Sequence, residues 1–343
     1  MTKSISTFVH TALHNYNVHP SADPVPQYST PNQVYLGHSD WMPMRALDVM
    51  SAPKHVSDFA ICGLAGLNFI TPLSPSRIIF TDINPSSLFF ALGLCSLILA
   101  CPTRAEWAAA LFGKSKSAAI AYLAQPDATD EGFFVLPTSD DEHAGWLKQF
   151  DTWGLPTEFS DLVTGLRNGE WTGSDWIPAA PGNTERPVFL FKSDFNQIRN
   201  PHPVSHYYGK GWLASEATYS LLRDRLLAAT VRLVQHNWMT ESWEERLLPT
   251  PLPKAAAVYV SNIGSTLPLQ AHKLDMYTDV IAPKIEASVL PDSAKELTRR
   301  LMIQFLQLNN LVNESIVHKN TEWICQFGRY ASADIQNIID TYS

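Results

Sequence analysis

Two glycines and one aspartate near the start of the chain have the types and spacing of a nucleoside-binding site. Gly63 and Gly66 follow the apolar run 59–62, and glycine allows a tight turn in which the backbone comes close to a ligand. Asp82 ends a second apolar run, 77–82, about twenty residues after the turn. A carboxylate there can accept two hydrogen bonds from the hydroxyls of a ribose, each contributing about 1.5–3 kcal/mol. We therefore predict a nucleoside site here; the alternative is an ordinary α/β sheet with an unrelated aspartate.

Other chemistries lack their motifs in this sequence. The turn holds only GxxG and not GxGxxG, and no phosphate-binding loop occurs, so dinucleotides and ATP are disfavoured relative to a nucleoside. Neither HExxH nor GxSxG is present, which removes the usual signatures of metalloproteases and α/β-hydrolases. The four cysteines, Cys62, Cys95, Cys101 and Cys325, have no CxxC spacing. We expect no metal and no disulfide framework.

The elements that must position the glycines and the aspartate form an alternating pattern. Short, continuous apolar runs are typical of strands buried on both faces of a parallel sheet, so we predict strands at 59–62 and 77–82. A buried helix should follow, with Asn84 as its cap and Pro85 in its first turn. Its apolar stretch is shorter than the ~20 residues that cross a bilayer. Further elements are predicted as strands at 187–194, 255–262 and 323–327 and as helices at 215–237 and 293–316.

Two segments stand outside this α/β pattern. We predict that residues 1–55 form an N-terminal arm or lid and that residues 56–343 form the binding domain. Within that domain, about 102–186 has no strand rhythm and is predicted to be a mostly helical insertion. Its tryptophans, such as Trp146 and Trp153, either roof a site or pack as ordinary core.

Composition limits the partners. The chain has 343 residues and a net charge of −8, and its lysines and arginines are scattered, so we expect no nucleic-acid partner and no membrane association. The N-terminus lacks the apolar core of a signal peptide, which together with the cysteine pattern predicts a cytoplasmic protein. A small molecule is the expected partner, and the sequence makes no prediction of oligomeric state.

Four short motifs, CGLAG, TDINP, KSDF and VYVSNIG, resemble those of class I S-adenosylmethionine (SAM) dependent enzymes. The likeness is closest to the branch that uses the 3-amino-3-carboxypropyl arm of SAM. This branch includes the aminocarboxypropyl transferases of betaine-lipid, nicotianamine and isonocardicin biosynthesis and the azetidine-2-carboxylate synthases. The resemblance covers the sheet, about half of the chain, and implies a Rossmann-like class I fold that binds SAM as substrate.

The resemblance also implies roles for residues at the ends of the predicted strands. Asp82, with Ile83 beside it, would hold the ribose, while Asp194 would accept from the adenine amine and Phe195 would pack against the ring. Ser261 and Asn262 would face the reacting end of SAM, although the same residues also fit a plain turn.

Three further candidates lie on polar, aromatic segments. Tyr35 and Arg45 in the arm would cover the amino-acid end of SAM, with Arg45 as anchor for its carboxylate; the alternative is that the arm only packs on the domain. His206, in the loop after the predicted third strand, could act as a base or could belong to a surface loop.

The activity implied by the resemblance is opening of SAM at Cγ of its aminobutyrate arm, with release of 5′-methylthioadenosine. The product would be azetidine-2-carboxylate, formed by cyclisation, or a small acceptor that has received the 3-amino-3-carboxypropyl group. Two alternatives stay open. One is a small-molecule methyltransferase, and the other is a SAM-binding scaffold without catalysis.

Overall fold

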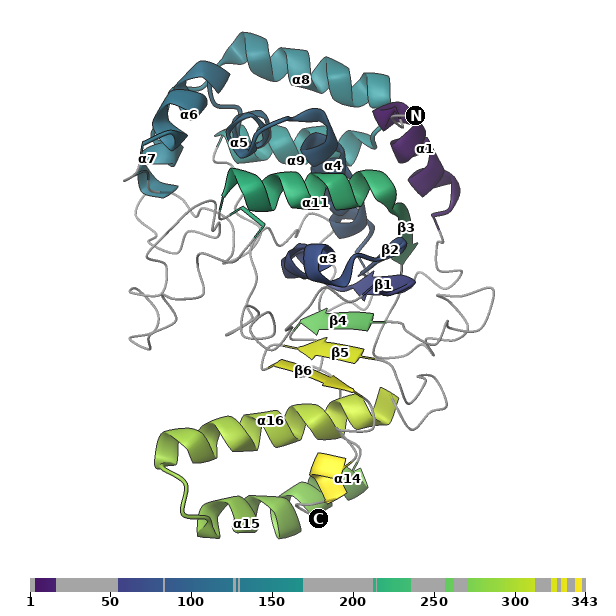
Figure 1. Cartoon of the computed structure of the whole chain (residues 1–343), viewed down its shortest axis with the longest axis vertical. Helices are drawn as coiled ribbons and strands as arrows, with labels where there is room; N and C mark the ends of the chain where they lie inside the picture. The colour runs from purple at the N-terminus through teal and green to yellow at the C-terminus, as the bar shows by residue number, and fades with distance from the viewer. Residues whose placement is uncertain are drawn as a thin grey trace.

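The structure is a computed structural model, shown in Figure 1. It describes the following residues: 4–16, 55–82, 84–125, 128, 130–168, 212–213, 215–235, 257–261, 271–311, 322–325, 328–331 and 337–340. Over this part of the chain, no helix has both the length and the apolar character needed to cross a bilayer.

A six-stranded sheet in the order β3-β2-β1-β4-β5-β6 forms the centre of the fold. Strands β1 to β5 run parallel, and β6 closes the sheet as an antiparallel partner of β5. The α/β prediction is confirmed, and the order is compatible with a Rossmann-like, doubly wound sheet. The strands are β1 (Asp58–Ile61), β2 (Arg77–Asp82), β3 (Thr230–Gln235), β4 (Ala257–Ser261), β5 (Glu322–Cys325) and β6 (Gly328–Ala331).

The third strand corrects one prediction. The helix expected over 215–237 ends early, because α11 (Glu216–Ala228) is followed directly by β3. Val231 and Val234 continue the helical spacing of the preceding leucines, which is why the pattern favoured a longer helix. They are instead buried in β3, which pairs along the full length of β2. Pairing with β2 thus outweighs the local helical periodicity. The strand predicted at 187–194 lies outside the described residues.

Helices cover the sheet as the sequence predicts near its start. The turn η1 (Leu64–Gly66) and α3 (Leu67–Leu73) follow β1, and α4 (Pro85–Ala100) follows β2. Helix α4 is buried on almost every side, packing against β2, β3 and α1 (Ile5–His14). The predicted cap is confirmed, since Asn84 accepts a hydrogen bond from the Ser86 N–H.

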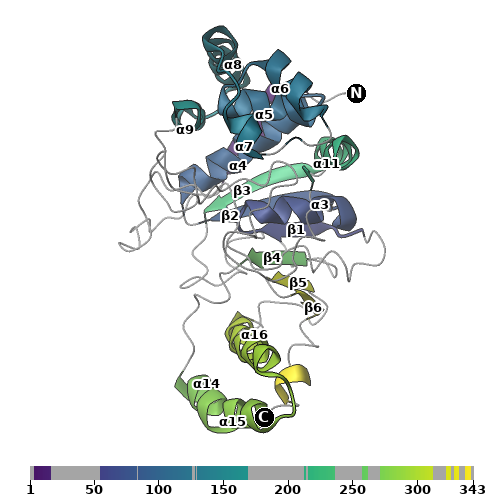
Figure 2. The same cartoon turned by 90° about the vertical axis from the view of Figure 1, so that its left-hand side faces the viewer.

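The insertion is mostly helical, as predicted, over its described residues 102–125, 128 and 130–168. Its helices lie beyond the β3 edge of the sheet in both Figure 1 and Figure 2. Trp146, Phe150 and Trp153 pack together, and Phe159 contacts Phe150 from the next helix; Trp153 thus belongs to the buried core, and Trp146 packs against it while partly buried. The helices are α5 (Arg104–Phe112), α6 (Lys116–Leu123), α7 (Asp130–Phe134), α8 (Asp140–Trp153) and α9 (Thr157–Asn168).

A second helical group lies at the opposite end of the molecule, beyond β6 in Figures 1 and 2. A π-helical segment, Tyr277–Ile281, joins its first two helices just before Pro283. Proline lacks the N–H of a regular helix and clashes with the preceding turn, which accounts for the wider local winding. The helices are α14 (Ala271–Met276), α15 (Ala282–Ala287) and α16 (Asp292–Leu311).

Candidate functional site at the carboxyl edge of the sheet

The carboxyl ends of β1, β2 and β4 lie side by side at one edge of the sheet. Ile61 at the end of β1 is in register with Phe80 of β2 on one side and with Tyr259 of β4 on the other. The chain passes from β1 to β2 on one side and returns to β4 on the other, so the strand order reverses at β1. Ligands of doubly wound sheets bind in the crevice outside such a switch point.

Gly63 opens the turn at this edge. Its φ is +86°, a conformation that favours glycine, and the residue is exposed. The preceding Cys62 still belongs to the sheet edge, because its N–H donates to the Tyr259 carbonyl at 2.9 Å. The Gly66 N–H donates back to the Gly63 carbonyl at 3.2 Å and closes the turn. The backbone of Gly63, which has no side chain to cover it, is therefore exposed two residues after the end of β1.

Gly66 has a packing role. A Cβ at this position would lie 2.4 Å from Cγ2 of Ile61 and 3.0 Å from Cδ1 of Tyr259. Its φ is −60°, so the backbone itself does not require glycine. The absence of a side chain lets the turn lie directly on β1 and β4, as the third glycine of a dinucleotide fingerprint does for its helix.

Asp82 is the carboxylate of the site. It is half-buried at the end of β2, and its Oδ1 accepts from the Asn84 N–H at 2.9 Å. Asn84 in turn caps α4 through the Ser86 N–H at 3.0 Å. This turn therefore fixes the orientation of the Asp82 carboxylate, which has about four acceptor positions.

Gln235 lies beside this carboxylate and was missed by the sequence analysis. It ends β3 in register with Asp82, and only 8% of it is exposed. Residues in register across parallel strands point to the same side of a sheet. A primary amide therefore neighbours the carboxylate at the site. The sequence signal was present in the segment TVRLVQ after the end of the helix, whose β-branched and apolar residues favour a strand.

The end of β4 carries a bulge. Its pairing with β5 shifts register between Tyr259 and Ser261. Bulges change the direction of the chain and recur next to active sites. Ser261, the last residue of β4, thus lies at the same edge of the sheet as Gly63.

The remaining predicted residues lie outside the described part of the chain. The site as described unites Gly63, Gly66, Asp82 and the backbone of Ser261, with Gln235 added by the structure. Outside it are Tyr35, Arg45, Ile83, Asp194, Phe195, His206 and Asn262.

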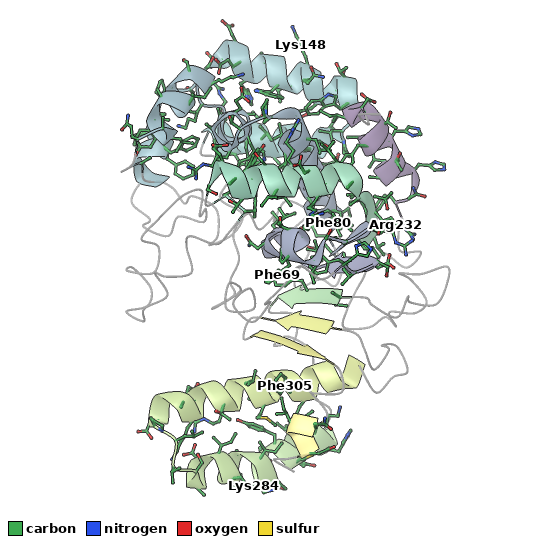
Figure 3. The ribbon with its side chains drawn as sticks, in the orientation of Figure 1. Phe69, Phe80, Lys148, Arg232, Lys284 and Phe305 are labelled. Carbon is green, nitrogen blue, oxygen red and sulfur yellow. The ribbon has the colours of Figure 1, made fainter. Side chains whose placement is uncertain are left out.

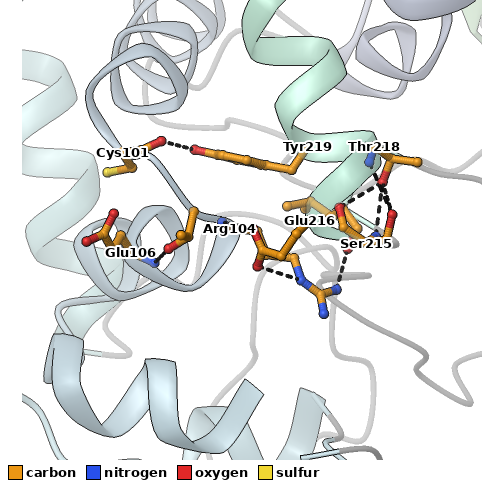
Figure 4. Close-up of polar contacts among 9 residues, drawn as sticks. Cys101, Arg104, Glu106, Ser215, Glu216, Thr218 and Tyr219 are labelled. Atoms are coloured by element: carbon orange, nitrogen blue, oxygen red, sulfur yellow. Dashed lines mark hydrogen bonds and ion pairs between the residues drawn. The ribbon is translucent and has the colours of Figure 1, made fainter. Parts of the chain in front are cut away.

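A polar cluster at the start of α11 holds this helix, and with it β3, against α4. Figure 4 shows the Tyr219 hydroxyl directed at the end of α4, where it donates to the Cys101 carbonyl at 3.0 Å. Arg104 donates to the Leu213 carbonyl and pairs with Glu216 at 3.3 Å. These contacts fix the start of the helix that leads into β3, and so they help to place Gln235 beside Asp82.

Burial removes two thiols from the chemistry available at neutral pH. It raises the pKa of Cys95 and of Cys101 to about 12, so both remain protonated. Protonated thiols are poor nucleophiles and poor metal ligands. Within the described ranges, no three His, Cys, Asp or Glu side chains gather as a metal site would require.

No protein-family model matches the chain, and no curated protein matches it significantly.

Proposed function

We propose that the chain binds the nucleoside part of SAM at the carboxyl edge of the sheet and opens SAM at Cγ. The observation that carries the proposal is that Gly63 follows β1 and Asp82 ends the neighbouring strand β2, both beside the switch point. An exposed turn without a phosphate loop and an oriented carboxylate suit a ribose better than a pyrophosphate. The resemblance of the strand-end motifs to SAM enzymes selects SAM among nucleosides.

In this proposal, Asp82 accepts hydrogen bonds from the ribose hydroxyls while keeping its bond to Asn84. Gln235, next to it on β3, is the proposed partner of the base attached to that ribose. Its amide can both donate and accept, as the adenine edge requires. Asp194 and Phe195 stay predictions for the adenine, as do Tyr35 and Arg45 for the amino-acid end.

Position decides which carbon of the sulfonium reacts. The α-amine and Cγ belong to the same molecule, so the protein would contribute by holding them in line, a positioning effect that can supply several kcal/mol. The amine lone pair forms the N–Cγ bond, the Cγ–S bond breaks towards sulfur, and the amine gives up a proton. The products are methylthioadenosine and azetidine-2-carboxylate. In the proposal, Asn262 and Ser261 hold the amine, and His206 is the candidate proton acceptor.

Binding is tested first, by calorimetric titration of SAM into wild type, Asp82→Asn and Asp151→Asn. The asparagine at 82 keeps an oxygen acceptor for the Asn84 N–H, so the turn survives while the charge is lost. We expect affinity to fall by about tenfold or more, the worth of one charge-assisted bond. The exposed Asp151 is a control for the loss of charge and should not change affinity. Equal affinities in all three proteins would refute the ribose assignment.

Reaction is tested by incubating the protein with SAM alone and identifying both products by mass spectrometry. Methylthioadenosine with azetidine-2-carboxylate supports cyclisation, and methylthioadenosine with homoserine or its lactone supports transfer to a missing acceptor. If SAM binds without turnover, small acceptors are screened. S-Adenosylhomocysteine in that screen would replace the proposal with a methyltransferase, and continued absence of product would replace it with a scaffold.

A further inference from the structure

A second polar cluster lies at the other edge of the sheet, where the strands begin. Asp58, Arg77 and Thr230 are in register across β1, β2 and β3. Arg232 lies two residues further along β3 and therefore points to the same side as Thr230. Figure 3 shows Arg232 beside this part of the sheet. We name these three charged residues, Asp58, Arg77 and Arg232, the basal cluster.

Charge is not balanced within the basal cluster. The buried carboxylate of Asp58 pairs with Arg77 through the arginine Nε. Arg232 is the second cation, and its pKa is lowered by burial and then by the neighbouring Arg77. One negative charge thus faces two positive charges across three adjacent strands.

One buried donor of the basal cluster lacks a partner. Among the described residues, the Nε of Arg232 is a buried polar atom without a hydrogen bond. Leaving such a group unsatisfied destabilises the native state, and more so for a charged group. Unsatisfied buried donors of this kind call for an explanation such as a bound ion.

We propose that the basal cluster binds a small oxyanion of the phosphate class. The guanidinium fork matches two oxygens of such an anion, and its charge would complete the balance with Arg77 and Asp58. The site is open to solvent, since Arg232 is half-buried and 30% of the Arg77 side chain is exposed. Four residues of β2 lie between Arg77 and Asp82, so the two are five residue steps, or about 16 Å, apart along the strand. The anion site is therefore distinct from the proposed nucleoside site.

The test compares phosphate with chloride at equal ionic strength, because general screening acts on all charges. Thermal unfolding and calorimetric titration with inorganic phosphate are measured on the full chain and on Arg232→Met. Phosphate should raise the melting temperature of wild type by a few degrees, since a ligand of the native state stabilises it. Arg232→Met should lose that rise, with affinity for phosphate reduced by about tenfold or more.

Three controls make the outcome decisive. Arg299→Met removes the same charge from α16, where Arg299 pairs with Glu286 and Glu296, and should keep the phosphate response. Asp82→Asn should keep it too, which separates this site from the nucleoside proposal. In chloride, Arg232→Met should melt no lower than wild type, because methionine removes an unsatisfied charge.

Four results would overturn the proposal. The first is a phosphate response that persists in Arg232→Met, and the second is one that is absent from wild type. The third is a lower melting temperature of Arg232→Met in chloride, which would show that Arg232 has a structural partner. The fourth is a response to succinate and not to phosphate at the same ionic strength, which would assign the cluster to a carboxylate.

Discussion

Replacing Gly66 with alanine tests the packing on which the candidate site depends. The new methyl group would lie 2.4 Å from Ile61 Cγ2 and 3.0 Å from Tyr259 Cδ1, and both neighbours are fully buried strand residues. Overpacking of this kind costs about 1–3 kcal/mol. Because φ is −60°, alanine also restricts the unfolded chain without strain, a gain of about 0.4–1 kcal/mol. We expect a net loss of about 1–2 kcal/mol in the free energy of unfolding.

The matched control is Gly145→Ala on the insertion helix α8. A Cβ there would meet nothing within 4 Å, so the same substitution should stabilise the protein by about 0.5–1 kcal/mol. Urea unfolding monitored by circular dichroism gives the two midpoints, which should move in opposite directions from wild type. SAM titration of Gly66→Ala should also show weaker binding, because relief of the clash moves the turn that carries Gly63. Should Gly66→Ala unfold at or above the wild-type midpoint, the close contact of this turn with β1 and β4 would be refuted.

Three further predictions concern buried polar groups. Burial and then Arg167 lower the pKa of His143, so the unfolded chain takes up a proton near pH 6.5 while the native state does not. The free energy of unfolding should therefore fall as the pH drops below about 6.5. In urea titrations at several pH values, His143→Gln should flatten that dependence. Tyr219→Phe should cost about 0.5–1.5 kcal/mol in the same assay, because a buried carbonyl loses its donor; no change would show that water replaces the hydroxyl. Cys95 and Cys101 should be alkylated only on unfolding, and their labelling in native buffer, located by mass spectrometry, would contradict the burial described.

The first half of the βαβ unit could be predicted because local and tertiary signals agree there. The run 77–82 is a strand from its first residue to its last, and Asn84 caps the following helix as expected. Each of these features depends on residues close to it in sequence. The strand is an uninterrupted apolar run, and the cap is an amide whose oxygen accepts a hydrogen bond from the N–H two residues further on. Such signals survive without knowledge of the rest of the fold.

The predictions that failed depended on partners far away in sequence. The sequence of 215–237 does not show that residues 230–235 pair with β2, because that pairing joins segments about 150 residues apart. The antiparallel partner β6 was also missed, since the sequence predicted only one strand in this region, at 323–327. The packing role of Gly66 was missed for the same reason, because one of the two side chains that exclude a Cβ comes from β4.

The corrected third strand changes the candidate site more than any other finding. In a parallel sheet the residue after each strand contributes to one shared edge, so the identity of the strand beside β2 decides which side chain neighbours Asp82. With 230–235 in that place, the neighbour is the amide of Gln235, a group that can donate and accept at once. A carboxylate suits the hydroxyls of a ribose, and an amide suits the donors and acceptors of a base. A nucleoside carries both groups in one molecule. The two strand ends therefore support a nucleoside more strongly together than Asp82 does alone, without reference to the chemistry that follows binding.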